Sequence, residues 1–224
     1  MPGRFAVILI LIGMTAMTAA ATTIRLIPFD QKVDRAASIF FGKCLRSESR
    51  LDPGGRIVTY STFAVEKMLK GAPAQEATVV LPGGTIGDVR TVVIGTPGLQ
   101  DGQEYVVFVR NTSAGPTILY WTQGVYSVET DAGGQKNVIP VARGAVLIDT
   151  QRGMAVAAEE AMPIAQFESR LRDTISRHEA LRMEMVERQR SHSRGLLAVL
   201  FDNKMLVLLG LGASAAAIRL LFRR

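Results

Sequence analysis

A long two-stranded hairpin pattern near the start of the chain constrains the fold most. Residues 38–50 begin with β-forming apolar side chains and end in alternating polar ones, which is typical of a strand that starts in a core and emerges into water. Residues 52–55, Asp-Pro-Gly-Gly, supply a turn, because proline presets φ and glycine accepts a positive φ. Residues 56–69 return with β-formers on alternating faces. We therefore predict an antiparallel hairpin on which the rest of the domain packs.

Further short strands are predicted after this hairpin, and turns rich in Gly and Pro separate them. The expected strands are 77–81, 89–94, 104–109, 117–121, 125–128, 138–141 and 145–148. Residues 104–109 are predicted to be buried on both faces, and residues 122–124 are predicted to form a three-residue hairpin loop. A short helix is expected at 30–37, with Asp30 as its cap. Because no long helical pattern separates the strands, we predict a mainly β fold, a small antiparallel barrel or sandwich.

The N-terminus has the pattern of a secretory signal peptide. Arg4 precedes the apolar residues 5–12, and small residues follow up to the alanines at 19–21. We predict that residues 1–21 are a cleaved signal peptide, which places residues 22–150 outside the cytoplasm as an exported β domain. The alternative is an uncleaved anchor, which polar residues in the second half of the segment disfavour.

The composition changes near residue 151, where alanine, glutamate and arginine replace valine and threonine. Residues 151–194 are predicted to be a charged amphipathic helical region. One seam recurs at alternating steps of three and four residues: Ile164, Phe167, Leu171, Thr174, His178, Leu181, Met185 and Arg188. Because polar side chains interrupt this seam, a helix lying on the domain or on a membrane is favoured over a coiled coil.

Residues 195–224 are predicted to be a C-terminal membrane anchor with a transmembrane helix. The stretch from Met205 to Phe222 would just cross the hydrocarbon core if Arg219 snorkels to the interface. A removable sorting signal is the alternative. The basic residues expected to flank the membrane are Arg188, Arg190, Arg194, Lys204, Arg219, Arg223 and Arg224.

The formal net charge of +6 belongs to this tail. Residues 22–150 carry thirteen Lys and Arg against twelve Asp and Glu, whereas residues 188–224 carry seven against one. A nucleic-acid-binding face would need a basic stripe across the globular part, so nucleic acid is not expected as a partner. Basic residues beside an apolar segment instead indicate membrane lipid as a partner.

The residues that usually carry catalysis are scarce. The two histidines, His178 and His192, lie in the charged helical region, away from the β domain. No imidazole is therefore expected near a serine or near the single cysteine, Cys44. The ligand spacing of a zinc site is also missing. We expect no catalytic residue, no metal and no cofactor, and interpret Cys44 as a small apolar residue of a half-buried strand.

Three aromatic residues are the candidate binding residues. Tyr120, Trp121 and Tyr126 fall on one predicted hairpin, and strand alternation places some of them on opposite faces. An inward Trp121 would plug the end of the barrel, whereas an outward Tyr120 and Tyr126 would form a contact patch. Core packing is the alternative for all three.

Three segments carry a family resemblance. They are residues 39–43, Ile-Phe-Phe-Gly-Lys, residues 60–71, which end in Met-Leu-Lys-Gly, and residues 102–109, Gly-Gln-Glu-Tyr-Val-Val-Phe-Val. They resemble a group of bacterial exported β-rich domains of unknown function and, more distantly, the OB-type barrel of netrin-like inhibitor domains. The resemblance covers about residues 37–130 and implies an OB-like barrel. The disulfide cysteines of the inhibitor domains are missing here, and no functional residues carry over.

These observations together favour a non-enzymatic cell-envelope protein. We expect it to be anchored in the cytoplasmic membrane with its β domain outside the cytoplasm, and to act by binding or assembly with an envelope protein partner. The alternatives are an extracytoplasmic hydrolase that uses carboxylate and hydroxyl residues, and a protease-inhibitor-like domain.

Overall fold

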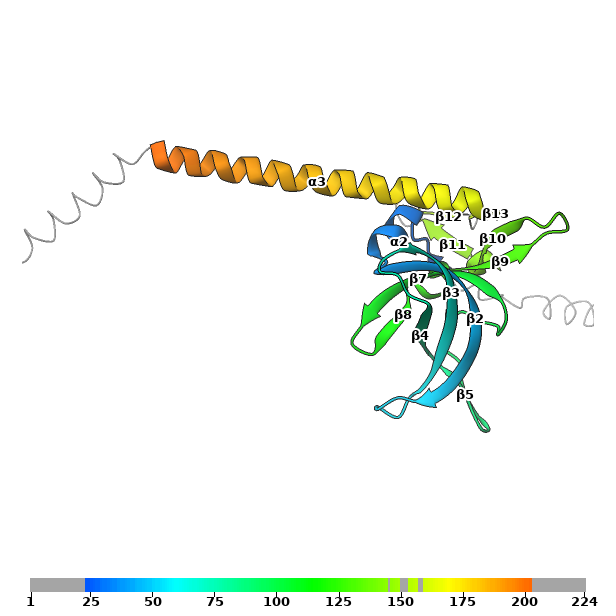
Figure 1. Ribbon diagram of the computed structural model, residues 1–224. Coiled ribbons are helices and arrows are strands. Elements are labelled where there is room, and N and C mark those ends of the chain that lie inside the picture. Colours follow the sequence, from blue (N-terminus) through cyan, green and yellow to red (C-terminus); the bar gives the residue numbers. More distant parts are fainter. Residues whose placement is uncertain (1–22, 145, 150–152, 157–158, 203–224) are drawn as a thin grey trace, which may run out of the picture. The chain divides into compact units, whose positions relative to one another are not determined.

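The computed structural model describes residues 23–144, 146–149, 153–156 and 159–202 (Figure 1). The predicted signal peptide and most of the predicted membrane anchor lie outside these residues. The elements follow in the order β1 (Thr23–Arg25), α2 (Phe29–Arg35), β2 (Ser38–Leu51), β3 (Ile57–Lys70), β4 (Glu76–Pro82), β5 (Gly84–Ile86), β6 (Val89–Thr91), β7 (Glu104–Thr112), β8 (Gly115–Ile118), η1 (Trp121–Gly124), β9 (Val125–Thr130), β10 (Lys136–Pro140), η2 (Val141–Gly144), β11 (Val146–Asp149), β12 (Met154–Val156), β13 (Met162–Pro163) and α3 (Ile164–Asp202).

One large antiparallel sheet organises the domain, and its strand order is β13-β10-β9-β7-β2-β3-β4, with β8 paired to β7. The predicted hairpin is confirmed, because β2 and β3 pair from Ile39–Lys70 to Leu51–Ile57 around a turn at residues 52–56. Among the described residues, no backbone pairing joins β4 to β8 or β13 to β4. The mainly β class with a C-terminal helix is confirmed, but the sheet does not close into the expected barrel.

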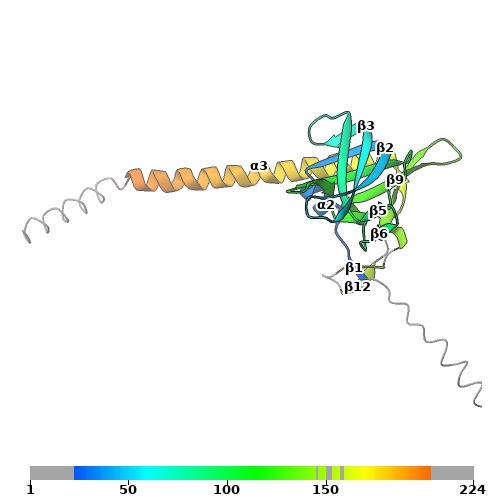
Figure 2. The same ribbon diagram turned by 90° about the horizontal axis from the view of Figure 1, so that it is seen from below.

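The hairpin is strongly bent, as Figure 2 shows for β2 and β3. The pairing register of β2 with β3 shifts at three places, between Ile39 and Phe40, between Phe41 and Gly42, and between Cys44 and Arg46. Such bulges increase local twist and bend a strand. A Cβ atom at Gly42 would lie 2.4 Å from the carbonyl oxygen of Ala64, so the bend brings the two backbones too close for any other residue.

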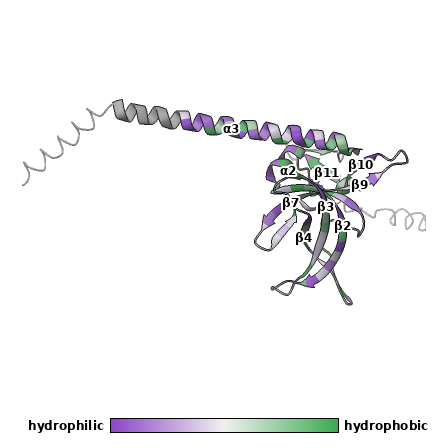
Figure 3. Ribbon diagram, viewed as in Figure 1, coloured by the Kyte–Doolittle hydropathy of each residue, from purple (hydrophilic) through white to green (hydrophobic). Residues whose placement is uncertain are grey.

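The buried core lies against β7, in which the five residues from Tyr105 to Val109 are all buried, as predicted for a strand covered on both faces. One face contributes to a core with Phe40 and Phe63, whose rings meet edge to face. The other face carries Phe108, which packs against Phe29 of α2. In Figure 3, β2 changes from apolar to polar colouring towards its turn, in agreement with the sequence pattern.

The predicted hairpin over residues 117–128 is wrong. β8 pairs with the second half of β7 and β9 with the first half, so both run in the same direction along one edge of β7. η1 interrupts this path without reversing it. The prediction took Gly124 as a sign of a hairpin turn. Glycine is instead required there because a Cβ atom would collide with the carbonyl oxygen of Leu119.

Other local predictions differ from the structure in smaller ways. Asp30 does not cap α2; the helix begins after Pro28, and no side chain bonds its N-terminus. The strand predicted at 89–94 is β6, which ends at Thr91 and pairs with β5. β1 pairs in parallel with β11, and β12 completes this small second sheet (Figure 2).

The region predicted to be helical from residue 151 begins with strands, and α3 starts only at Ile164. The chain divides into two compact units, of which the first ends at Leu171 and the second begins at Arg172. Phe167 and Leu171, in the first turns of α3, belong to the core of the first unit. No helix of the described part of the chain has the length and apolar character needed to span a bilayer.

Candidate binding groove

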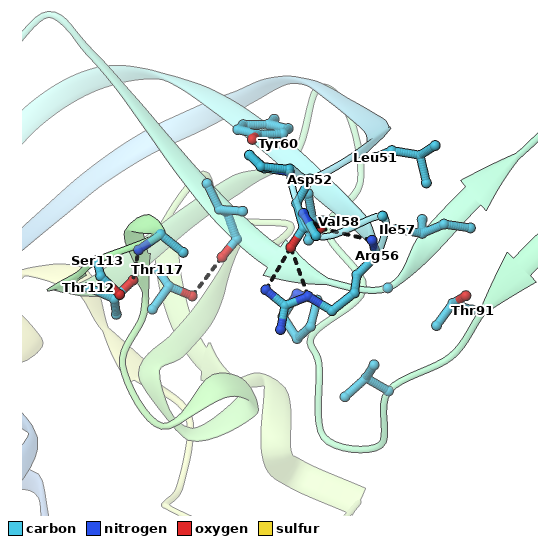
Figure 4. A pocket seen from close by; sticks show the side chains of 18 of the residues that line it. Leu51, Asp52, Arg56, Ile57, Val58, Tyr60, Thr91, Thr112, Ser113 and Thr117 are labelled. Carbon is cyan, nitrogen blue, oxygen red and sulfur yellow. Dashed lines mark hydrogen bonds and ion pairs between the residues drawn. The ribbon is translucent and has the colours of Figure 1, made fainter.

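A groove of about 1140 Å³ lies beside the face of β3 and β4 that carries Val58, Tyr60 and Val80. It lies between the β2–β3 turn and the β7–β8 turn, with residues of β4 and β6 in its wall. Figure 4 shows Thr112 and Thr117 on one side of this groove and Leu51 and Thr91 on the other. Thr117 donates a hydrogen bond from Oγ1 to the carbonyl oxygen of Val80 at 2.7 Å, which ties β8 to β4 beside the groove.

Two smaller hollows adjoin this groove. One, of about 300 Å³, shares Thr91 and Val93 with it, and the other, of about 410 Å³, shares Arg110 and Trp121 with it. The segment from Val89 to Gly95 contributes to all three hollows. The first hollow lies on the face of β3 that carries Val58 and Tyr60, and the second lies on the opposite face, with Thr59 and Ser61. We call the three together the groove.

Large apolar side chains are exposed along this groove. Leu51 is 63% exposed and Val89 62%, and both line the largest hollow. Val92 lines the second hollow and is 70% exposed, and Ile94 lines the third and is 75% exposed. Single exposed apolar residues are ordinary, whereas a set of them in one region is typical of interaction surfaces.

Tyr120 and Trp121 lie at this groove with an unusual backbone. Both have a φ of 54°, in the left-handed region that residues other than glycine rarely adopt. The indole ring of Trp121 packs closely on Gly95. A Cβ atom added at Gly95 would lie 3.1 Å from Cε3 of this ring. The next turn is held by Gln123, whose side chain accepts a hydrogen bond from the Ile27 amide at 2.9 Å and donates one to the Arg25 carbonyl at 2.8 Å. Consecutive left-handed residues are strained, and such strain concentrates at functional sites.

The charged residues of the groove are mostly arginines. Arg25, Arg56, Arg90 and Arg110 line its three hollows, and the carboxylate that lines it is Asp52. Asp52 accepts hydrogen bonds from the Gly54 and Arg56 amides and pairs with the Arg56 guanidinium at 2.7 Å, as Figure 4 shows. The Arg56 amide and guanidinium lower the pKa of Asp52, so its charge is already neutralised locally.

A second cluster of polar residues is buried between α2, β9 and the first turns of α3. Lys32 of α2 donates to the hydroxyl of Tyr126 at 2.5 Å and to Oε2 of Glu159 at 3.2 Å. The Tyr126 hydroxyl donates to the same Glu159 oxygen at 2.6 Å, and Arg170 pairs with Oε1 at 3.5 Å. The rings of Phe29, Phe108 and Phe167 surround this cluster. We call it the buried ion cluster.

Burial shifts the pKa values in the buried ion cluster. It lowers the pKa of Lys32 below the ordinary 10.5, although the Glu159 carboxylate opposes this shift. Burial, and then the charge of Glu159, raise the pKa of Tyr126 well above the ordinary 10.0. Lys32, Tyr126 and Glu159 line none of the three hollows of the groove.

The structure separates the three predicted binding residues. Tyr120 and Trp121 are half-buried and both line the hollow of about 410 Å³. Tyr126 is only 2% exposed and belongs to the buried ion cluster, so it does not form a surface patch with Tyr120. Trp121 does not plug a barrel end, because it lines the outer groove.

The predicted membrane-flanking residues are only partly described. Arg188 lies in α3 and pairs with Glu184 at 2.7 Å, and Arg190 lies in the same helix. The side chain of Arg194 and the whole of Lys204, Arg219, Arg223 and Arg224 lie outside the described part of the chain.

No protein-family model, curated protein or solved structure matches the chain. Its function must therefore be inferred from its own residues.

Those residues offer little for catalysis. Burial raises the pKa of the Cys44 thiol, which works against the reactive thiolate form. Within the described ranges, no three His, Cys, Asp or Glu side chains are grouped closely enough to hold a metal ion. His178 lies on α3 in the second unit, away in sequence from every residue of the groove.

Sequence reasoning missed the arginines and the exposed apolar residues of the groove. They come from turns and loops that are far apart in the chain, from Arg25 to Trp121. The available signal was the pattern of residues 89–94, which places apolar side chains at Val89, Val92 and Ile94 without the alternation of a half-buried strand.

Proposed function

We propose that this chain is a non-enzymatic cell-envelope protein whose exported β domain binds a partner in the groove. The observation that carries the proposal is the set of exposed apolar side chains that line three neighbouring hollows, beside the strained pair Tyr120–Trp121. Keeping such a surface in water is unfavourable by about 25 cal/mol for each Å² of apolar area. A partner that covers it recovers this free energy.

The sequence supports the cellular setting of this proposal. The signal-peptide pattern at residues 1–21 directs export, and the apolar stretch followed by arginines at the C-terminus fits an anchor whose end is cytoplasmic. The β domain then faces the outside of the cytoplasmic membrane, where the groove meets other envelope proteins.

Binding is favoured over hydrolysis by the charges of the groove. A hydrolase built on carboxylates needs two of them on either side of the scissile bond, at least one with a perturbed pKa. The carboxylate that lines the groove, Asp52, is held by backbone amides and Arg56. Apolar and basic side chains dominate instead, which suits recognition.

Site-specific photo-cross-linking in cells tests the binding role. A photoreactive amino acid replaces Val89 in the groove or, as a control, Leu45, which is exposed on β2 and does not line the groove. We expect a discrete cross-linked product from position 89 that position 45 does not give. We also expect Leu51→Asp to abolish it. Equal products from both positions, or none from position 89, would refute the proposal.

Protease protection tests the location. In osmotically opened cells, we expect added protease to remove the β domain and to leave a small C-terminal fragment protected by the membrane. A tag at Arg224 should react with a membrane-impermeant reagent only after the membrane is broken. A tag that reacts in sealed cells would contradict the predicted orientation.

A further inference from the structure

We propose that the hollow of about 410 Å³ beside Trp121 binds the C-terminal end of a partner protein, whose last residue supplies both an apolar side chain and the α-carboxylate. This inference rests on the proposed function and names the part of the partner that is recognised. A ligand of this one hollow does not need to reach the other two.

Hydrogen bonds between separate segments hold this hollow in shape. The residues that line it are Arg25, Ile27, Ile94, Gly95, Arg110 and those from Tyr120 to Gln123. The side-chain amide of Gln123 accepts a bond from the Ile27 amide at 2.9 Å and donates one to the Arg25 carbonyl at 2.8 Å. The Thr122 amide donates to the Gly95 carbonyl at 3.2 Å. The hollow is therefore preorganised, and a ligand loses little affinity to the ordering of its walls.

The charges of this hollow are both positive. Arg25 and Arg110 are exposed, and within the described part of the chain neither guanidinium group has a hydrogen-bond or ion-pair partner in the protein. No Asp or Glu is among the described residues that line the hollow. Guanidinium groups bind carboxylates through two parallel hydrogen bonds, so this pair complements a ligand that carries a carboxylate.

Apolar side chains lie in the same hollow as these arginines. Ile94 is 75% exposed, and the half-buried indole ring of Trp121 packs on Gly95. An exposed apolar surface beside unpaired positive charges suits a ligand in which an apolar group is joined closely to a carboxylate.

The end of a chain meets this requirement better than an internal acidic segment does. Successive side chains of an extended segment point to opposite faces, so an acidic side chain and its apolar neighbour point away from each other. The last residue instead carries its carboxylate and its side chain on one Cα atom. A hollow of about 410 Å³ is also small for a ligand site, which suits a single terminal residue. A fatty acid has the same two groups, but its longer apolar chain needs more cover.

The fluorescence of Trp121 tests this inference directly. Trp121 is the single tryptophan of the chain, so a change in its emission reports on this hollow. The full-length protein in detergent is titrated with a short peptide of Gly and Ser that ends in Leu with a free carboxylate. Two comparison peptides have the same sequence with a C-terminal amide, or Ser in place of the final Leu. Octanoate is the fatty-acid probe.

We expect the free-acid Leu peptide to bind at least about tenfold more tightly than its amide, the effect of losing hydrogen bonds between charged groups. Its binding should weaken as salt rises, whereas that of the amide should not. The peptide that ends in Ser should also bind more weakly, because it leaves the apolar surface of the hollow uncovered.

Matched variants separate this hollow from its neighbours. Arg25→Ala and Arg110→Ala should each weaken binding about fivefold, the upper range for a charged contact at an exposed surface. Arg90→Ala should change nothing, since Arg90 is equally exposed but lines the hollow of about 300 Å³. Ile94→Ser should weaken binding, and Val92→Ser, at a comparably exposed position of that other hollow, should not. Unchanged circular dichroism melting curves will show that the variants fold.

Equal binding of the acid and amide peptides, an effect of Arg90→Ala as large as that of Arg110→Ala, or binding of octanoate without binding of the peptide would overturn the inference. These failures differ from failure of the proposed function. If Val89 still gives a discrete cross-link in cells, the groove binds a partner of another chemistry. If it gives none, the binding role itself fails.

Discussion

Tyr126 shows how single residues tie the domain together. Its hydroxyl accepts from Lys32 and donates to Glu159, so one group links α2 to the segment before α3. Lys32 also contacts Glu159 directly. A buried lysine is unfavourable unless its ammonium group is paired, and here two oxygens satisfy it. Since Tyr126 is fully packed against Phe108 and Phe167, its role is structural.

The variant Tyr126→Phe should destabilise the domain. It keeps the ring contacts but removes one hydrogen bond to each of two charged groups, so we expect a loss of about 1.5–3 kcal/mol. Tyr60→Phe is the matched control, because Tyr60 is half-buried in the groove wall and its hydroxyl has no bonding partner in the described residues. Urea unfolding will measure both. A loss no larger than that of Tyr60→Phe would contradict a structural role.

The raised pKa of Tyr126 predicts a loss of stability in alkali. Below pH 10.0 the tyrosine is protonated in both states, and its contribution is complete. As the pH rises above 10.0, the unfolded state releases the proton first, and stability falls. The lowered pKa of Lys32 acts in the opposite direction, adding stability up to pH 10.5. Unfolding of wild type and Tyr126→Phe between pH 9 and 11 separates the two, and the variant should show the smaller alkaline loss.

At the scale of elements, the bend of β2 and β3 creates the groove. An unbent hairpin would lie flat on the sheet, but the bulges turn its far end, with the turn at residues 52–56, towards the β7–β8 turn. Gly42 lies at one of these register shifts and contacts the Ala64 carbonyl. The bend therefore depends on a position where no side chain fits.

The variant Gly42→Ala should destabilise the domain by about 1–3 kcal/mol, the range for overpacking, since its Cβ atom would push against backbone and force the paired strands apart. Gly98→Ala is the control, because Gly98 has open space around it and no positive φ. We expect the control to change stability by less than about 0.5 kcal/mol. Equal melting temperatures of the two variants would show that the strands adjust freely.

At the scale of the whole molecule, the first turns of α3 complete the β domain. Phe167 meets Phe29, Phe108 and Tyr126 edge to face, and Leu171 is buried. Arg170 also pairs with Glu159, and Glu168 pairs with Lys67 of β3 at 2.7 Å. The first compact unit ends at Leu171, eight residues into this helix.

Two truncations test where the domain ends. A chain of residues 22–177 keeps Phe167 and Leu171, and should fold cooperatively. A chain of residues 22–163 lacks both, and should lose at least the roughly 3–5 kcal/mol expected for deleting one buried phenylalanine. Thermal unfolding by circular dichroism will compare them. If the shorter chain melts at the same temperature, the α3 contacts contribute nothing to the domain.

The hairpin, the buried strand β7 and the helix α3 were predictable because each is encoded locally, by alternation, by a continuous apolar run or by steps of three and four residues. Tyr126 and Trp121 were both predicted as binding residues from the same stretch of sequence, but Tyr126 is buried and Trp121 lines the groove. The sequence could not show that β8 and β9 run along one edge of β7, since Gly124 reads equally as a hairpin turn or as a close backbone contact.

The sequence by itself determined the mainly β class, the central hairpin and the charged helix that follows. It also carries the export and anchor patterns on which the location is proposed. Only the tertiary structure decided that Tyr126 is buried with Lys32 and Glu159, and that arginines from four separate segments line three neighbouring hollows. The physical reason is that periodicity specifies which face of a strand is buried, whereas a groove depends on how distant turns meet once the sheet bends.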